Sequence, residues 1–190
     1  MPDPAAPSVT SLLPGSPSTS SSSVSADGRN SKPFFFDDHL DHDAASTWQV
    51  LRSEFDDLLL QNARRLGVEV LEGTTATEPI SHDGYNVGLV VQDESGATRE
   101  IFAPITIDAS GRECFFVRQR RWRKGEPDLN RLALWAYFEG TLRDEGRNEG
   151  ATTIARLPED GWFWYIPLHK NQASVGVVAQ AHTLLRAESD

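Results

Sequence analysis

The sequence predicts an α/β (α+β) fold, built from one amphipathic helix and a larger number of mainly antiparallel strands. Three observations predict it. Apolar residues recur at helical spacing over residues 53–66. Short alternating runs separated by turn residues occupy 74–108, as in a β-meander. Longer apolar and aromatic runs then fill 129–180, which indicates a second group of strands.

Length and charge restrict the classes of function. A chain of 190 residues is one domain or part of a larger one. The formal net charge of -10 argues against a nucleic-acid or anionic-membrane partner. Cys114 is the single cysteine, which excludes an internal disulfide and fits a reducing compartment, so we expect a cytoplasmic protein. We also see no apolar run of about 20 residues and no secretory signal.

Residues 1–31 are rich in Ser, Pro and Ala and include the run 20–23 of four serines. Such a segment buries too little apolar surface to offset the entropy of ordering, so we predict that it is disordered. The acidic segment 37–43 also contains His39 and His42. It could hold a metal ion, but it lacks the ligand spacing of a zinc site, and we interpret it as a solvated loop.

The helix over 53–66 has recognisable ends. Ser53 and Asp56 fit a capping box, and Gly67 suits the position just after the helix. We expect short strands on both sides, at 48–51 and 68–71.

The meander over 74–108 contains a strand at 85–92, a turn at 94–97 and a returning strand at 99–102. A short β-rich run at 105–108 then leads into a turn, and a short helix is expected within 112–121.

The strands after residue 128 are predicted at 129–140, 151–157, 161–167 and 173–179. The third reads Gly-Trp-Phe-Trp-Tyr-Ile-Pro. Alternation along a strand places one set of its side chains, Trp162, Trp164 and Ile166, opposite Phe163 and Tyr165. Both faces are large and apolar, so we expect both to be covered; the simplest interpretation is a buried core strand.

The order Trp162-x-Trp164-x-Ile166-Pro167 resembles the signature of flavin-dependent (tryptophan-type) halogenases, a family of the FAD-dependent oxidoreductase superfamily. The resemblance implies that residues 32–190 form a partial FAD/NAD(P)-binding fold with a β-meander and the start of an antiparallel substrate-domain sheet. In that family the strand lies beside the passage between flavin and substrate, and keeps the substrate away from the flavin oxidant.

The resemblance also implies cofactor-binding residues. Residues 49–70 are similar to the family segment in which an arginine, here Arg52, opens a helix near the flavin. Asp108-Ala109-Ser110-Gly111 resembles a D-A-x-G turn beside the dinucleotide, so Asp108 and Gly111 are candidates. The alternatives are that Arg52 is a surface residue at a helix start, and that Asp108 caps an ordinary strand-to-helix turn.

The implied reaction is halogenation of an aromatic or pyrrole-like small molecule. Reduced FAD, supplied by a separate flavin reductase, forms a hydroperoxide that oxidises halide to hypohalous acid, and a lysine then positions the halogen. Lys32 is the candidate because it precedes the segment 48–66, as in the family order; the alternative is a solvated lysine.

Two family motifs do not occur in these 190 residues: the G-x-G-x-x-G turn that cradles the pyrophosphate, and a later G-D motif. Three hypotheses therefore stand. The chain is a halogenase, a related flavin monooxygenase or reductase, or a non-catalytic truncated remnant of such an enzyme.

Overall fold

The computed structural model describes residues 15–185, which divide into two compact units. The first unit contains the chain up to residue 62 and again from 128 onward, and the second contains 63–127. The boundary falls near the C-terminal end of α1, Arg52–Arg65. No helix in 15–185 is long and apolar enough to cross a membrane.

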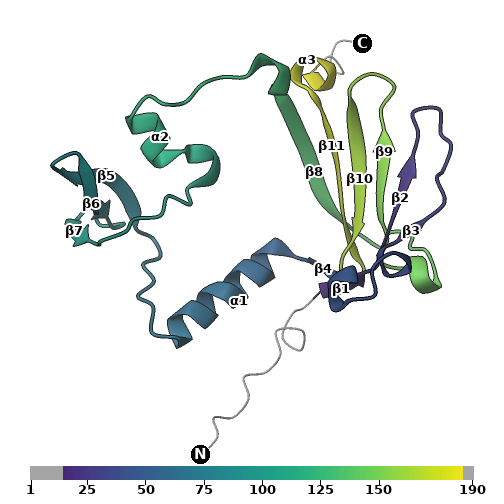
Figure 1. Ribbon diagram of the computed structural model, residues 1–190, viewed down its shortest axis with the longest axis horizontal. Helices are drawn as coiled ribbons and strands as arrows, with labels where there is room; N and C mark the ends of the chain where they lie inside the picture. Colours follow the sequence, from purple (N-terminus) through teal and green to yellow (C-terminus); the bar gives the residue numbers. More distant parts are fainter. Residues whose placement is uncertain (1–14, 186–190) are drawn as a thin grey trace, which may run out of the picture. The chain divides into compact units, whose positions relative to one another are not determined.

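A six-stranded sheet, in the order β3-β2-β9-β10-β11-β8, dominates the first unit (Figure 1). Its strands are β2 Ser20–Val24, β3 Phe34–Phe35, β8 Arg131–Glu139, β9 Thr152–Arg156, β10 Gly161–Pro167 and β11 Gln172–Gln180. All neighbours are antiparallel except β2 and β9, which run parallel. A separate pair joins β1 Gly15–Ser18 to β4 Thr47–Val50. Besides most of α1, the helical pieces of this unit are η2 Phe36–Asp38, η3 Asp43–Ala45, η6 Gly146–Asn148 and α3 Ala181–Leu184.

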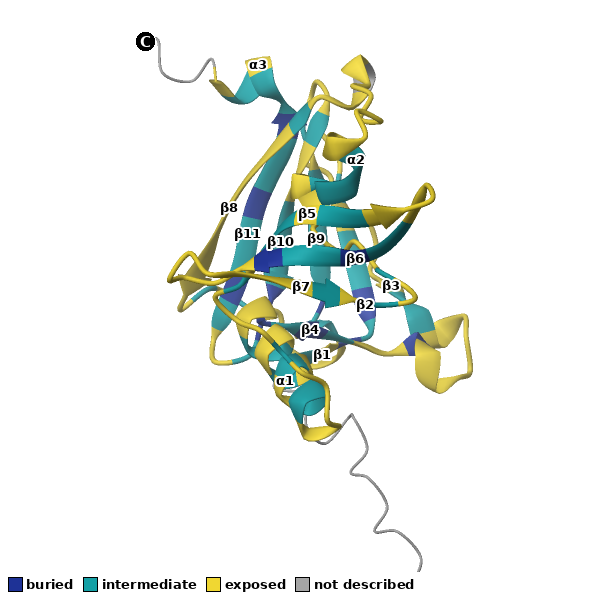
Figure 2. Ribbon diagram, turned by 90° about the vertical axis from the view of Figure 1, so that its left-hand side faces the viewer, coloured by how far each residue is buried: buried dark blue, intermediate teal, exposed yellow. Residues whose placement is uncertain are grey.

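β11 is the best-buried strand of this sheet, as its blue bands in Figure 2 show. It pairs on both sides, and Ala173 and Ala179 have no exposed surface. Between its terminal glutamines, all of its side chains are small or β-branched, which leaves room for the bulky aromatic residues of β10 and β8. The buried apolar residues of the unit include Ala173 and Ala179 on β11, together with Leu51, Ala151 and Leu168 next to the ends of other strands.

The second unit is organised around the antiparallel meander β5-β6-β7, formed by Thr75–His82, Tyr85–Gln92 and Thr98–Phe102. The meander is followed by η4 Gly111–Glu113 and α2 Phe115–Gln119, and η5 Pro127–Leu129 leads back into β8. Val91 is the buried apolar residue of this unit. The predicted meander, its turn and the short helix are thus observed close to their expected positions.

Several expectations from the sequence are wrong. Residues 15–24, predicted to be disordered, form β1 and β2, where the small serine side chains allow close strand pairing with β4 and β9. Of the rest of that prediction, 25–31 form a turn with an isolated bridge from Asn30 to Val24, and 1–14 lie outside the described residues. Neither 68–71 nor 105–108 forms a strand, because no neighbouring strand supplies a hydrogen-bonding partner for either run.

The ends of α1 follow the predicted chemistry only in part. The helix begins at Arg52, and the amide of Phe55 donates to the Leu51 carbonyl, so Ser53 lies inside the first turn rather than at the cap. At the other end Gly67 takes φ of +88°, and the amides of Gly67 and Val68 donate to the carbonyls of Arg64 and Ala63. Gly67 is therefore the predicted C-terminal cap.

Candidate functional site

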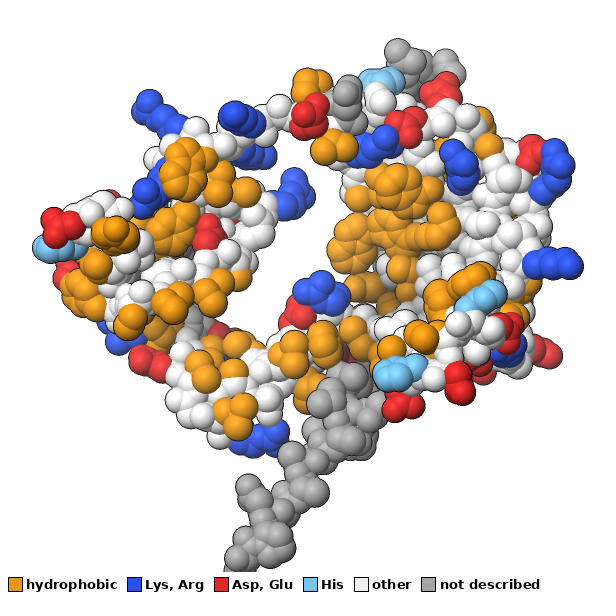
Figure 3. All heavy atoms as spheres, in the orientation of Figure 1, with side chains coloured by type: hydrophobic (Ala, Val, Ile, Leu, Met, Phe, Trp, Pro, Cys, Tyr) orange, Lys and Arg blue, Asp and Glu red, His pale blue; other side chains and the backbone are white. Residues whose placement is uncertain are grey.

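The aromatic strand β10 presents two different faces. Its register with β11 places Trp162, Trp164 and Ile166 on the face that also carries Trp135 and Tyr137 of β8, and we call this the indole face. Phe163, Tyr165 and Pro167 lie on the opposite face. Hydrophobic side chains gather on this sheet in the space-filling view (Figure 3).

Trp164 is held in a notch at the centre of the indole face. Gly176 lies directly opposite it on β11, and a Cβ atom there would come within 2.3 Å of Trp164 Cζ2 and 2.7 Å of Trp135 Cβ. The indole therefore occupies the space that a side chain at 176 would fill. Its Nε1 donates to the Ser174 hydroxyl at 3.2 Å, which restricts rotation of the ring.

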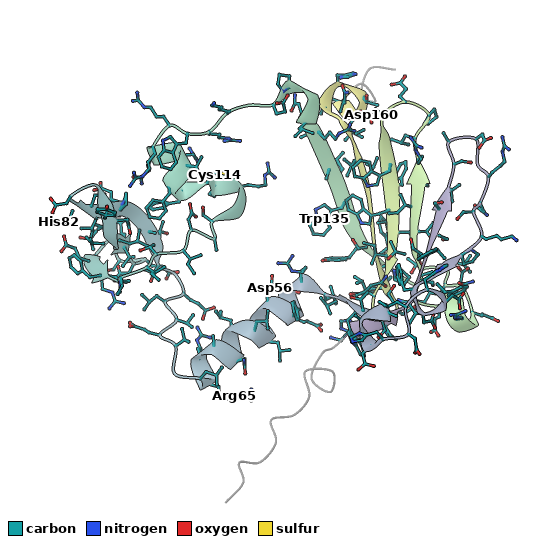
Figure 4. All side chains as sticks on the ribbon, in the orientation of Figure 1. Asp56, Arg65, His82, Cys114, Trp135 and Asp160 are labelled. Atoms are coloured by element: carbon teal, nitrogen blue, oxygen red, sulfur yellow. The ribbon has the colours of Figure 1, made fainter. Side chains whose placement is uncertain are left out.

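Aromatic contacts extend the face toward β8. The rings of Trp135 and Tyr137 meet edge to face, with centroids 5.2 Å apart. Both side chains are largely exposed, at 58% and 42%. Figure 4 marks Trp135 midway along β8. The expectation that both sides of the aromatic strand are covered is wrong, because Trp162 and Phe163 also keep 37% and 44% of their surface exposed.

A charged group borders the indole face at one end. The guanidinium of Arg131 lies 6.0 Å from the centre of the Trp162 ring and donates to Asp160 at 2.6 Å, in the turn labelled in Figure 4. This carboxylate raises the pKa of Arg131, and Arg131 in turn lowers the pKa of Asp160. Nη1 of Arg131 is buried without a hydrogen-bond partner in the protein. The indole face thus combines flat apolar surface with one fixed cation.

The opposite face is anchored by a loop. The hydroxyl of Tyr165 donates to the Leu142 carbonyl at 2.5 Å, and Pro167 is buried. Nη2 of Arg143 donates to the Gln172 carbonyl at 2.6 Å and also to that of Leu168. The Tyr165 hydroxyl and the Arg143 guanidinium therefore hold the loop that follows β8 against the strands.

The Asp108 turn belongs to the second unit. Asp108 Oδ1 accepts from the amide and the hydroxyl of Ser110, at 2.9 and 2.5 Å, and Oδ2 accepts from the Phe116 amide at 3.0 Å. These bonds, the Ser110 hydroxyl first, lower the pKa of the carboxyl. Asp108 thus accepts hydrogen bonds from its own turn and from the first turn of α2, whose N-cap residue is Cys114.

A cavity of about 630 Å³ lies beside this turn. Its lining mixes apolar and charged side chains, including Leu89, Ile107, Glu113, Phe115 and Arg118. Gly111 adopts φ of +59°, and a Cβ atom there would meet nothing within 4 Å. A ligand can therefore approach the backbone of the turn closely at Gly111.

The other candidates are solvent-exposed. Arg52 opens α1, and its guanidinium binds both oxygens of Asp56, at 3.0 and 3.1 Å. That carboxylate is the main cause of its raised pKa, to which Tyr137 contributes. Lys32 lies between β2 and β3. Another lysine, Lys170, donates to Glu54 at 2.6 Å, and this hydrogen bond is the main reason that the pKa of the Glu54 carboxyl is lowered.

The acidic segment after β3 is tied to a loop. Arg147 Nη2 contacts Asp37 and lies 2.7 Å from Asp38, and its guanidinium sits 3.8 Å from the centre of the Phe35 ring. The Nδ1 atom of His42 accepts from the Ala44 amide at 3.0 Å. Within 15–185, no group of three or more metal-ligating side chains is placed to hold a metal ion.

Sequence reasoning missed the partners of the aromatic strand. It predicted the strand that contains Trp135 and Tyr137 but did not place these two residues beside Trp164. It also missed Gly176 and the Arg131–Asp160 pair. The available signal was Gly176 itself, since a glycine within a run of β-branched residues indicates close approach of another group.

The chain is similar to known proteins over most of its length. Residues 19–189 match the family described as tryptophan halogenase. A flavin-dependent halogenase of Armillaria mellea is 36% identical over 140 residues, which cover 70% of this chain and 28% of the relative. A brominase of Pseudoalteromonas luteoviolacea, named for 1H-pyrrole-2-carbonyl on a peptidyl-carrier protein, is 32% identical over 70% of this chain and 33% of its own.

A tryptophan 2-halogenase of Chondromyces crocatus is 34% identical over 70% of this chain and 26% of its own. Among solved structures, the myxobacterial chondrochloren halogenase, described as FAD-dependent, superimposes with a TM-score of 0.78 at 27% identity, over 95% of this chain and 41% of that one. The chain thus spans about a quarter to a third of these curated relatives.

Proposed function

Because the chain belongs to the tryptophan halogenase family, we propose that it forms part of an FAD-dependent halogenase and that its indole face binds the organic substrate. The observation that carries the proposal is the arrangement of Trp162 and Trp164 on one accessible sheet face beside Trp135. An electron-rich aromatic or pyrrole-like ring fits such a surface by stacking and edge contacts. The names of two relatives, for tryptophan and for a carrier-bound pyrrole, support this substrate class.

The role of the indole face in this proposal is to orient the ring and to exclude water. Trp164 cannot rotate freely, because Gly176 and Ser174 hold its indole in one position. A fixed wall of this kind lowers the cost of aligning the substrate carbon with a halogenating species. The signature side chains Trp162, Trp164 and Ile166 contain no acid, base or nucleophile, so their contribution is positioning.

The proposed cofactor is reduced FAD, supplied by a separate flavin reductase. When bound, it provides the electrons with which oxygen is activated to oxidise halide. Gly111 fits a cofactor role, because its backbone is open to close approach beside the cavity. Asp108 fits the role of holding that turn, since both of its oxygens already accept hydrogen bonds within the protein. Arg52 retains exposed guanidinium surface that could meet an anionic group.

Flavin binding and halide dependence together test this proposal. The purified chain is titrated with FAD by fluorescence, and then assayed with a flavin reductase, NADH, bromide or chloride, and indole- and pyrrole-containing substrates. We expect a bound flavin spectrum and products in which halogen replaces hydrogen. Hydroxylated products that form without halide would instead identify a monooxygenase. Absence of flavin binding would overturn the enzymatic proposal for this chain and favour the non-catalytic remnant.

Lys32 is the proposed halogen-positioning amine. In the same assay, Lys32→Ala is expected to lower product formation on the order of 10²-fold without changing flavin affinity, as for loss of a positioned catalytic group. The matched control is Lys124→Ala, which removes another lysine and should leave the rate unchanged. An unchanged rate in the Lys32 variant would identify Lys32 as the solvated loop residue of the alternative interpretation.

A further inference from the structure

The outer edge of β8 is an unpaired strand edge. Among the described residues, β8 is the last strand of the six-stranded sheet, and only β11 pairs with it (Figure 1). Its nine residues contain no proline and no lysine, and all of them after Arg131 are exposed (Figure 2). A long, exposed, apolar edge without such protective residues is a template for pairing with another strand.

The backbone groups on this edge can be assigned. The Gly140 amide donates to the Asn171 carbonyl, so the even-numbered positions of β8 direct their backbone groups toward β11. The odd-numbered positions, Arg131, Ala133, Trp135, Tyr137 and Glu139, therefore direct their N–H and C=O groups outward. These five alternate residues offer five N–H and five C=O groups to a further strand.

The side chains of β8 are complementary to their own reversed order. We propose that β8 pairs antiparallel with β8 of a second copy of this chain, with Trp135 opposite Trp135. This register places Arg131 opposite Glu139 twice, once at each end of the pair. Between them Leu132 faces Phe138, and Ala133 faces Tyr137. Opposite charges and aromatic pairs directly across two strands are the contacts that stabilise antiparallel pairing.

Other registers lack this complementarity. A shift by one residue sets outward backbone groups against inward ones, so the ladder cannot form. A shift by two residues places Arg131 opposite either Tyr137 or Thr141 and loses both ion pairs. Charge and backbone direction thus select the same register.

The proposed pairing has a consequence for the indole face. The two-fold axis stands perpendicular to the sheet at Trp135, so the indole faces of both copies lie on the same side of one continuous sheet. Trp135 of each copy then borders the aromatic surface of the other. This interface concerns the assembly of the sheet and does not depend on the proposed halogenase activity.

Charge exchange at the two ends of β8 tests the interface. Sedimentation equilibrium of the full chain over a concentration series is expected to give a monomer–dimer equilibrium. Glu139→Arg places like charges opposite each other and should raise the dimer dissociation constant at least tenfold. Combining it with Arg131→Glu restores opposite charges in this register, and should recover most of the loss. Glu149→Arg, the same charge change in an exposed loop, should have no effect.

Arg131 also binds Asp160, so a second variant leaves that pair intact. Ala133→Pro removes an outward N–H that β11 does not use, and should abolish the dimer while the circular dichroism spectrum is retained. A monomer at every concentration would overturn the proposal. A dimer that is insensitive to both Glu139→Arg and Ala133→Pro would overturn it as well.

Discussion

The two units of the chain hold their candidate functional elements by different physical means. In the six-stranded sheet, Trp164 is fixed by the shape of its surroundings, because Gly176 leaves room for the indole and Trp135 borders it. In the meander unit, the turn at Asp108 is fixed by hydrogen bonds, because one carboxylate accepts from Ser110 and Phe116. The first arrangement depends on volume and the second on charge.

This difference determines how each element can be disturbed. Packing is sensitive to the addition of a single carbon atom and insensitive to pH. The exposed turn at Asp108 has room for added volume, but its hydrogen bonds depend on the carboxylate being ionised. Substitutions that change only volume or only charge should therefore affect one unit and leave the other unchanged.

Gly176→Ala should have the largest effect. Its Cβ would lie 2.3 Å from Trp164 Cζ2 and 2.7 Å from Trp135 Cβ, so the indole must leave its position. Overpacking of this kind costs about 2 kcal/mol of unfolding free energy, although alanine is otherwise acceptable in a strand. Urea unfolding followed by tryptophan fluorescence measures the loss.

The matched control for this substitution is Gly125→Ala, because a Cβ atom at Gly125 would meet nothing within 4 Å. It should change the unfolding free energy by less than about 0.5 kcal/mol. Combining Gly176→Ala with Trp164→Ala should cost less than the sum of the two single changes, because the clash with the indole is then absent. Additive costs would show that the notch does not hold Trp164.

Asp108→Asn should have an intermediate effect that depends on pH. The folded pKa of Asp108 lies below its unfolded value of about 3.9, so its ionised form stabilises the folded turn at neutral pH. That contribution is complete above the unfolded pKa and is lost as the pH falls through the folded pKa. Amide exchange at Ser110 and Phe116 should be faster in the variant at pH 7, and the difference should vanish in strong acid.

The control for the charge is Asp144→Asn, which removes an exposed carboxylate in a loop of the other unit. It should leave exchange at Ser110 and Phe116 unchanged. If the amides of Ser110 and Phe116 exchanged as slowly in Asp108→Asn as in the unsubstituted chain at pH 7, the carboxylate would not be the group that holds the turn.

The fold was predictable where a local signal was strong. Helical spacing and Gly67 located α1, and alternation located the meander and the strands β8 to β11. The serine-rich strands β1 and β2 carry no such signal, because their order comes from pairing with β4 and β9, far along the chain. At 68–71 the β-prone residues predicted a strand, but strand formation also needs a neighbour that composition cannot supply.

The candidate site was predictable in its residue types and only partly in its geometry. The spacing of Trp162 and Trp164 fixes that they share a face. That Trp135 joins them depends on the register of β8 with β11, which no local pattern gives. Whether Asp108 caps a helix or contacts a cofactor was open, because the same residue type serves both roles.

Ser174→Ala should have the smallest effect, and it sharpens the comparison by testing whether any hydrogen bond matters in the packed unit. The change leaves the indole against Gly176 but removes the bond from Trp164 Nε1 to the Ser174 hydroxyl, which we expect to contribute about 1 kcal/mol. Trp164→Phe removes the same bond together with the indole atoms Cζ2 and Cη2 that pack against Gly176, and the double variant should cost little more than Trp164→Phe alone. Fully additive costs would mean that the two side chains do not interact and that volume alone positions the indole.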